Sequence, residues 1–255
     1  MIPGSRWRAQ AVTLALAVAL VGVTACGDDG GGAAPTSTRP PLESPPDPGP
    51  VPGDDGLDDE TRDAAIASTV RVAGIACGRM SEGSGFAITD SLVATNAHVV
   101  VGVDPVQVDL VDGRRLDAEV VAFDAVADLA LLRVDAHDLV PLPLGDADDG
   151  TVGALIGWEA DPAPDPTPFR IDRPITVRIE EVAGVERVER PSWLLAADVE
   201  SGDSGAAFVT ADGTVVGVAY ATTTRNAGVG YAVRAEAVEA LLAAGLSSTV
   251  DVPGC

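Results

Sequence analysis

"VESGDSGAAF" spans residues 199–208, and the turn at its centre decides how the whole chain is interpreted. Ser204 stands between Asp203 and Gly205, and Gly202 precedes the pair. All of these residues favour turns, so the motif is either an ordinary surface turn or a loop that presents a serine hydroxyl to a substrate. The second interpretation requires a base for the hydroxyl and an acid that orients the base. The rest of the chain must supply both groups.

The composition narrows the class of protein. The chain has 255 residues, of which 46% are hydrophobic, enough for one large domain or two small ones. Its formal net charge of −23 argues against nucleic acid as a partner, because phosphate binding needs a basic face. Such a surface repels copies of itself, and we expect a monomer. No metal or organic cofactor is implied by the motifs.

The first 25 residues predict a secretory signal. Arg6 and Arg8 form a basic start, residues 9–23 are an apolar run, and small residues follow. This run is short for a membrane span, although an uncleaved anchor helix is the alternative. The segment "VTAC" that ends at Cys26 resembles the lipobox of bacterial lipoproteins. That resemblance implies a lipidated Cys26 that anchors the protein at the extracytoplasmic face of the cell membrane.

Residues 26–61 are rich in Pro, Gly and Asp. Eight prolines lie between Pro35 and Pro52, and acidic residues and glycine fill much of the remainder. Such a segment cannot bury enough apolar surface to fold, and we expect a disordered, partly extended tether. The folded domain is then expected over residues 62–255.

Beyond residue 62, short β-rich runs alternate with Gly, Asp and Pro turns, from "STVRVAGIAC" (68–77) to "GVGYAVR" (228–234). That many short strands at this spacing predicts closed β-barrels or a sandwich. The apolar residues of "RAEAVEALLAAG" (234–245) have helical spacing and end at a glycine, which predicts a C-terminal helix.

Only two histidines can supply a base for Ser204. His137 lies in the polar stretch "VDAHDLVPL", which favours a solvated loop. His98 lies in "SLVATNAHVV", just after a predicted strand, where a lone histidine could also be a buried core residue. Asp128 follows 30 residues later, at the start of a strongly apolar strand. Together these residues make His98 the better candidate.

Four short motifs carry a resemblance to a known family. In this order and at these spacings, "GSGFAI", "TNAHVV", "ADLALLRV" and "GDSG" resemble the chymotrypsin-fold serine proteases. The resemblance covers roughly residues 65–255 and is nearest to the bacterial trypsin-like branch of HtrA-type and mycobacterial periplasmic serine proteases. It implies an all-β fold of two six-stranded antiparallel β-barrels with a C-terminal helix.

The same resemblance implies a role for each member of a catalytic triad. His98 is the general base, Asp128 its orienting acid and Ser204 the nucleophile. Serine is a poor nucleophile at its free pKa, so an imidazole must take its proton, and a carboxylate must fix the tautomer of that imidazole. Asp124 and Asp135 are competing acids, but "DLALL" directly follows position 127, as in the family motif.

The turn at residues 202–204 is the expected oxyanion hole. The backbone N–H groups of Gly202 and Ser204 would converge where the substrate carbonyl becomes an oxyanion, each contributing roughly 3 kcal/mol. Asp203, between them, is expected to turn inward as a structural partner. Alanines at positions 206 and 207 replace the glycine and proline that often follow this motif in the family.

By alignment to the family, the first substrate pocket falls near Asp198 and the strand that contains Ala219, Tyr220 and Ala221. Asp198 lies six residues before Ser204, where an acid could attract Arg or Lys, or could instead cap a turn in the loop. The two alanines and the tyrosine would otherwise make a small apolar pocket.

With Cys26 assigned to lipid, Cys77 and Cys255 remain as a pair in an oxidising, exported setting. The segments "ACGRMSEGSGF" and "DVPGC" resemble the mycobacterial periplasmic branch, in which such cysteines are bridged. A disulfide is therefore expected, and two unpaired thiols are the alternative.

The sequence thus predicts an exported, membrane-tethered serine endopeptidase that acts on protein or peptide substrates through an acyl-enzyme. A catalytically silent binding or scaffold lipoprotein with the same fold is the alternative, although all three triad residues are present. A lipase or esterase would favour Gly-x-Ser-x-Gly and the chain order Ser, acid, His, whereas here the order is His, Asp, Ser.

Overall fold

The computed structural model describes residues 47–158, 164–180, 182, 184, 186–222, 227–248 and 250–254. The predicted signal peptide, Cys26, the first part of the predicted tether and Cys255 lie outside the described residues. Among the described residues, no helix combines the length and the apolar character needed to cross a bilayer.

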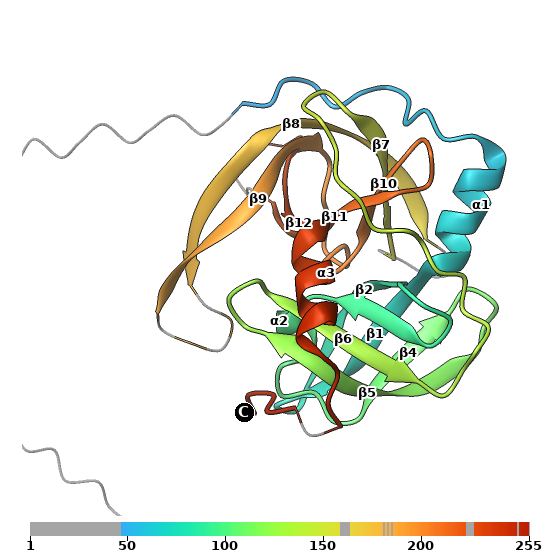
Figure 1. Ribbon diagram of the computed structural model, residues 1–255, viewed down its shortest axis with the longest axis vertical. Helices are drawn as coiled ribbons and strands as arrows, with labels where there is room; N and C mark the ends of the chain where they lie inside the picture. Colours follow the sequence, from blue (N-terminus) through green and yellow to red (C-terminus); the bar gives the residue numbers. More distant parts are fainter. Residues whose placement is uncertain are drawn as a thin grey trace, which may run out of the picture. The chain divides into compact units, whose positions relative to one another are not determined.

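The first half of the described chain forms a closed antiparallel barrel with the strand order β1-β2-β3-β6-β5-β4 (Figure 1). Its strands are β1 (Thr69–Ala76), β2 (Arg79–Ala87), β3 (Leu92–Thr95), β4 (Val106–Leu110), β5 (Arg115–Asp124) and β6 (Leu129–Val134). A one-turn helix, α2 (Ala97–Val100), follows β3.

The second half forms another closed antiparallel barrel with the strand order β10-β11-β12-β9-β8-β7. Its strands are β7 (Val152–Gly157), β8 (Asp165–Glu180), β9 (Arg187–Ala197), β10 (Ala207–Thr210), β11 (Val215–Thr222) and β12 (Val229–Arg234). The expected fold of two six-stranded barrels is confirmed.

Alternating polarity explains why these segments pair as strands with one face inward. In β4, Val106, Val108 and Leu110 are buried, while Gln107 and Asp109 between them are half-buried. Successive side chains of a strand point to opposite faces, so the apolar set fills the barrel interior. Closing the sheet also removes its exposed edges.

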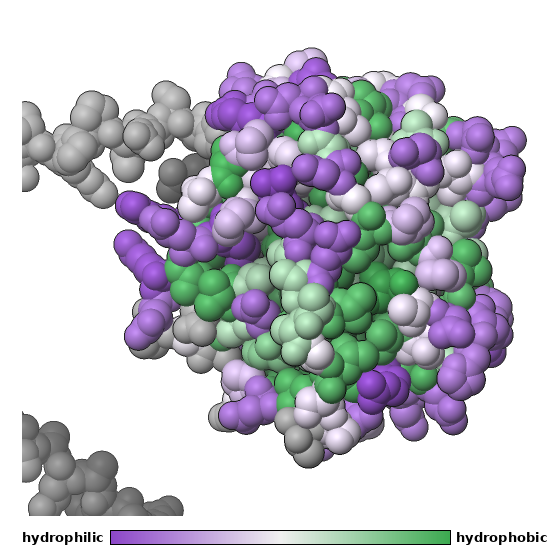
Figure 2. All heavy atoms as spheres, viewed as in Figure 1, coloured by the Kyte–Doolittle hydropathy of each residue, from purple (hydrophilic) through white to green (hydrophobic). Residues whose placement is uncertain are grey.

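Helix α3 (Ala235–Ala244) is the expected C-terminal helix and ends at Gly245, whose φ of 101° suits a glycine. The helix contacts β5 and β6 of the first barrel and β11 and β12 of the second, and so it joins the two. In Figure 2, apolar side chains gather over the face on which α3 lies, and hydrophilic side chains surround them.

Residues 47–61 differ from the expected tether. They run along the folded domain and enter α1 (Asp59–Ser68), so the expected boundary between residues 61 and 62 lies inside a helix (Figure 1). Asp58 caps this helix by accepting a hydrogen bond from the Thr61 N–H at 2.8 Å. Leu57 is buried, and Asp55 forms two hydrogen bonds with Arg62, which hold the segment in place.

Asp55 makes the stability of this segment dependent on pH. Burial raises the pKa of its carboxyl, but the hydrogen bonds from Arg62 and from the Leu57 N–H outweigh burial and hold the pKa below the usual 3.8. Because the pKa of Asp55 is lower in the folded state than in the unfolded state, its ionised carboxylate stabilises the folded protein above about pH 4. This stabilisation is lost as the pH falls through the folded-state pKa.

We expect Asp55→Asn to lower the free energy of unfolding at pH 7 by about 1–2 kcal/mol, a range reduced because Arg62 is one-third exposed. Urea unfolding at pH 7 and below pH 4 measures this, and the difference between variant and wild type should shrink in acid. Asp63→Asn, on the exposed side of α1, is the matched control. Equal unfolding free energies for the Asp55 and Asp63 variants at pH 7 would contradict the expectation.

Candidate active site

His98 and Asp128 form a hydrogen-bonded pair at the end of the first barrel. The Nδ1 atom of His98 lies 2.9 Å from Oδ2 and 3.0 Å from Oδ1 of Asp128, and the His98 backbone N–H donates to Oδ1 at 2.9 Å. The Asp128 side chain is only 4% exposed, whereas the His98 side chain is 37% exposed. The carboxylate therefore holds Nδ1 and leaves Nε2 as the nitrogen able to exchange a proton with another group.

The turn before β6 holds Asp128 in an uncommon backbone conformation, with a φ of 60°. Asp124 stabilises this turn, because its Oδ1 accepts hydrogen bonds from the N–H groups of Val126 and Ala127 at 2.9 and 2.8 Å. The Asn96 side-chain amide also donates a hydrogen bond to the Asp128 carbonyl oxygen at 2.9 Å. Asp124, one of the competing acids, therefore supports the turn, and no hydrogen bond joins it to His98 in the described part of the chain.

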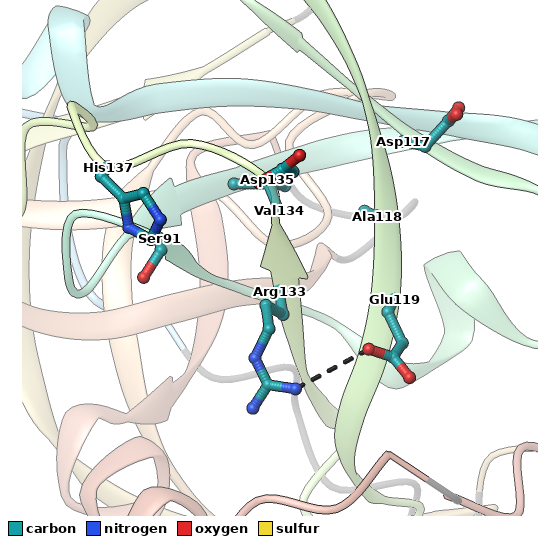
Figure 3. Close-up of a pocket in the computed structure, with 8 residues that line it drawn as sticks. All are labelled: Ser91, Asp117, Ala118, Glu119, Arg133, Val134, Asp135 and His137. Carbon is teal, nitrogen blue, oxygen red and sulfur yellow. Dashed lines mark ion pairs between the residues drawn. The ribbon is translucent and has the colours of Figure 1, made fainter.

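The second histidine lies elsewhere. His137 and Asp135 line an open pocket of about 500 Å³ outside the first barrel (Figure 3). Asp135 and His137 follow the last residue of β6, whereas Asp128 precedes its first residue, so the two acids lie roughly 20 Å apart along the strand. His137 is exposed, as expected of a solvated loop, and the described residues contain no group of three or more metal-ligating side chains that could hold an ion.

Strand β2 brings the Ser204 turn to the histidine. The Ser84 N–H donates to the Ser204 carbonyl oxygen at 2.8 Å. A Cβ atom on Gly83 would lie 2.8 Å from that same oxygen and 2.7 Å from the side chain of Val99, which directly follows His98. Ser204 is half-exposed. In the described part of the chain no hydrogen bond joins its hydroxyl to the imidazole, and such bonds often tighten only when substrate binds.

Gly205 shows why a glycine must follow the serine. Its φ is 91°, and a Cβ atom there would collide with the Ser84 carbonyl oxygen and come within 2.5 Å of Thr95 Oγ1. The turn can therefore pack directly against β2 and β3 only when this position has no side chain.

The predicted oxyanion-hole residues form one tight turn. Gly202 has a φ of 111°, and neither its N–H nor that of Ser204 has a hydrogen-bond acceptor among the described residues. The Asp203 N–H instead donates to the Glu200 carbonyl oxygen at 3.3 Å. The Asp203 side chain is buried, and its Oδ2 accepts from the Glu200 N–H at 2.8 Å. The turn thus combines two backbone N–H groups that have no acceptor in the described part of the chain with a buried carboxylate.

Ser84 is a buried residue that forms several hydrogen bonds around the Ser204 turn, and the sequence interpretation missed it. Its hydroxyl accepts a hydrogen bond from the Trp158 N–H and donates one to the Gly202 carbonyl oxygen, both at 2.8 Å. Its own carbonyl oxygen accepts from Thr95 Oγ1 at 2.7 Å. One serine on β2 thereby fixes the turn before Ser204 against both barrels. The motif "GSGFAI" contained the signal, but a serine in a strand does not reveal partners so distant in sequence.

We expect Ser84→Ala to lower the free energy of unfolding by about 1–3 kcal/mol, because it leaves a buried N–H and a carbonyl oxygen without their partner. Chemical denaturation measures the change. Ser91→Ala removes a hydroxyl that, among the described residues, donates to the exposed Asp90 side chain, and serves as the control. A Ser84 variant as stable as the Ser91 variant would refute this role.

The residues predicted for specificity have different positions. Asp198 is exposed directly after β9. Ala219 and Tyr220 are buried, and the Tyr220 hydroxyl lies 3.0 Å from Ser192 Oγ. Burial raises the pKa of Tyr220. Both side chains pack in the protein interior, and the side chain of Ala221 lies outside the described residues.

Comparison with known proteins finds similar protease domains. Residues 83–218 match the trypsin-like peptidase domain. A probable periplasmic serine endoprotease, DegP-like, of Halomonas elongata is 38% identical over 59% of this chain and 31% of its own length. Serine protease Rv3671c of Mycobacterium tuberculosis is 33% identical over 75% of this chain and 50% of its own length.

The crystal structure of the Rv3671c protease in its active form superposes with a TM-score of 0.75 at 30% identity, covering 84% of this chain and 98% of that one. The chain spans half or less of the length of the two curated relatives. The domain match nevertheless covers more than half of its 255 residues, including His98, Asp128 and Ser204. The chain belongs to the trypsin-like peptidase domain family.

Proposed function

We propose that this protein is an exported, membrane-tethered serine endopeptidase that cleaves peptide bonds through His98, Asp128 and Ser204. One observation carries the proposal: an exposed imidazole is held through Nδ1 by a buried carboxylate, and the turn that bears the half-exposed Ser204 packs on β2 at Gly83, which also faces Val99, the residue after His98. These are the three groups that a Ser-His-Asp triad requires.

The proposed reaction has two stages. His98 Nε2 takes the proton of the Ser204 hydroxyl as Oγ attacks the carbonyl carbon, and the N–H groups of Gly202 and Ser204 stabilise the resulting oxyanion. The imidazolium then gives its proton to the departing amine, which leaves an acyl-enzyme. A water molecule, deprotonated by His98, releases the acid product and restores the serine. Asp128 keeps the imidazole in the required tautomer throughout.

The relatives support the class of activity. One is described as a probable periplasmic serine endoprotease, and the similar crystal structure is described as a protease in its active form. We infer unfolded or flexible protein segments as substrates, because an endopeptidase must bind an extended backbone in its cleft. Turnover of a denatured protein, with the new N-termini sequenced, tests this. If the correctly folded chain produces no new N-termini from the denatured substrate, the scaffold alternative is favoured instead.

The membrane tether rests on the predicted lipidation of Cys26. We expect Cys26→Ser to move the protein from the membrane fraction to the soluble fraction, because a lipid anchor is lost and the rest of the chain is acidic. Immunoblots of fractionated cells measure the distribution. A variant that still sediments with membranes would exclude this anchor, and Ser37→Ala in the predicted tether is the matched control.

We also propose a disulfide between Cys77 and Cys255. Cys77 is disulfide-bonded, and Cys26 and Cys255 are the only other cysteines in the chain. The Pro253 carbonyl oxygen accepts a hydrogen bond from the Gly102 N–H at 3.0 Å, and Val103 pairs with Ala76, next to Cys77. The C-terminal tail thus reaches the β1–β2 turn two residues before the chain ends. Mass spectrometry of non-reduced tryptic peptides tests the bond.

A further inference from the structure

Arg190, on β9, is a buried cation beside the proposed triad. Its side chain is only 2% exposed, and it is the single buried Arg or Lys in the part of the chain that the structure describes. Moving a guanidinium out of water is costly unless a counter-charge and hydrogen bonds compensate for lost hydration. Its neighbours therefore indicate what this residue does.

Those neighbours are the triad acid and the turn that carries it. Arg190 Nη1 lies 3.5 Å from Oδ2 of Asp128, and Arg190 Nε donates to the Val126 carbonyl oxygen at 2.9 Å. Oδ2 is also the oxygen nearest to His98 Nδ1, at 2.9 Å. The carboxylate is thus held between the imidazole and the guanidinium, and the guanidinium also binds the backbone of the same turn.

Arg190 also reaches the strand behind the nucleophile. Its Cζ atom lies 4.8 Å from the centre of the Tyr220 ring, a cation–π arrangement. The Ala219 carbonyl oxygen, next to Tyr220 on β11, accepts the N–H of Gly205 at 2.8 Å. Arg190 therefore lies between the turn of Asp128 in the first barrel and the strand that supports the Ser204 turn in the second.

We propose that Arg190 is a positioning residue that holds the Asp128 carboxylate against His98 Nδ1. The inference rests on the function proposed above, since it concerns the orientation of the same base. Asp128 needs such support, because its backbone is in the left-handed region and its side chain is attached to a turn. The positively charged Arg190 guanidinium contacts both the Asp128 carboxylate and the Val126 carbonyl oxygen. These contacts stop the carboxylate and its turn from rotating away from the imidazole.

Two variants test the proposal. Arg190→Lys loses the hydrogen bond to the Val126 carbonyl oxygen. We expect this variant to fold, because it keeps the buried positive charge that pairs with Asp128. Arg190→Met removes the charge and leaves Asp128 without its counter-ion. We expect kcat to fall about 10-fold in the lysine variant and about 10²-fold in the methionine variant, with KM within about 2-fold of wild type, because a displaced base slows the chemical step without changing substrate contacts.

Arg234→Met is the matched control. Arg234 also stacks on an aromatic ring, with its Cζ atom 4.6 Å from the centre of the Trp193 ring, but its ion pairs are with the exposed Asp146 and Glu236. This variant loses the same kind of cation–π contact without touching the triad. Its kcat should remain within about 2-fold of wild type.

Proton NMR adds a readout that does not depend on turnover. The His98 Nδ1–H proton, bonded to a buried carboxylate, should resonate far downfield in the wild type and the Arg234 variant, and should move upfield or broaden in both Arg190 variants. A folded Arg190→Lys variant with wild-type kcat and an unchanged downfield resonance would overturn the positioning role. If the wild type cleaves nothing, the proposed function fails, while the resonance still decides the role of Arg190.

Discussion

Ser204→Ala reduces peptide hydrolysis by about 10⁶-fold if Ser204 is the nucleophile, because no other group can then form the acyl-enzyme and the histidine has no proton to take. The fold should be retained. Ser204 is half-exposed, and its contacts with β2 are made by backbone atoms, which alanine preserves. Initial rates on a denatured protein substrate, together with the melting temperature, measure both effects.

The neighbouring hydroxyl offers a control for this prediction. Ser201 is exposed on the same loop, and Ser201→Ala should change the rate by less than about 3-fold. If the Ser204 variant still turns over substrate at a measurable fraction of the wild-type rate, with contaminating protease excluded, another residue is the nucleophile and the triad is misassigned.

Asp128→Asn is expected to lower kcat by about 10⁴-fold, because an amide cannot hold the imidazole in the tautomer that accepts the serine proton. The same change should lower the free energy of unfolding by about 3–5 kcal/mol. Arg190 would lose its counter-charge in a site where its side chain is 2% exposed, and a buried charge without a partner is strongly destabilising. Initial-rate assays measure kcat, and urea titrations measure the free energy of unfolding independently.

Asp135→Asn separates this account from the competing assignment of the acid. Asp135 is exposed beside His137 at the far end of β6, so its variant should match the wild type in both rate and stability. If the Asp135 variant lost activity while the Asp128 variant kept it, the orienting acid proposed here would be wrong.

The fold was predictable because its information is local. Alternation such as Val106-Gln107-Val108-Asp109-Leu110 specifies a half-buried strand within five residues, and turn residues separate the runs. Placing His98 next to Asp128 required more than periodicity. It came from the resemblance of four short motifs to a family, and the structure then placed the two side chains within hydrogen-bonding distance.

The remaining features depend on partners that are far apart in sequence. Arg190 is followed by a proline in a strand with many charged neighbours, and nothing local shows that it is buried or that it meets Asp128, 62 residues away. Ser84 bonds to groups 74 and 118 residues away. Residues 47–61 looked like a continuation of the Pro-rich segment, because a contact that holds them, from the Arg170 side chain to the Pro48 carbonyl oxygen, joins residues 122 positions apart.

The most direct test of the triad is to treat the purified protein with a fluorophosphonate and to locate the adduct by peptide mass spectrometry. This reagent phosphonylates a serine only where a neighbouring base activates the hydroxyl. The geometry predicts one adduct per chain, on Ser204, and no adduct after His98→Ala or Ser204→Ala. A correctly folded wild-type protein that remains unlabelled, or one that is labelled at another serine, would contradict the claim that His98, Asp128 and Ser204 act together.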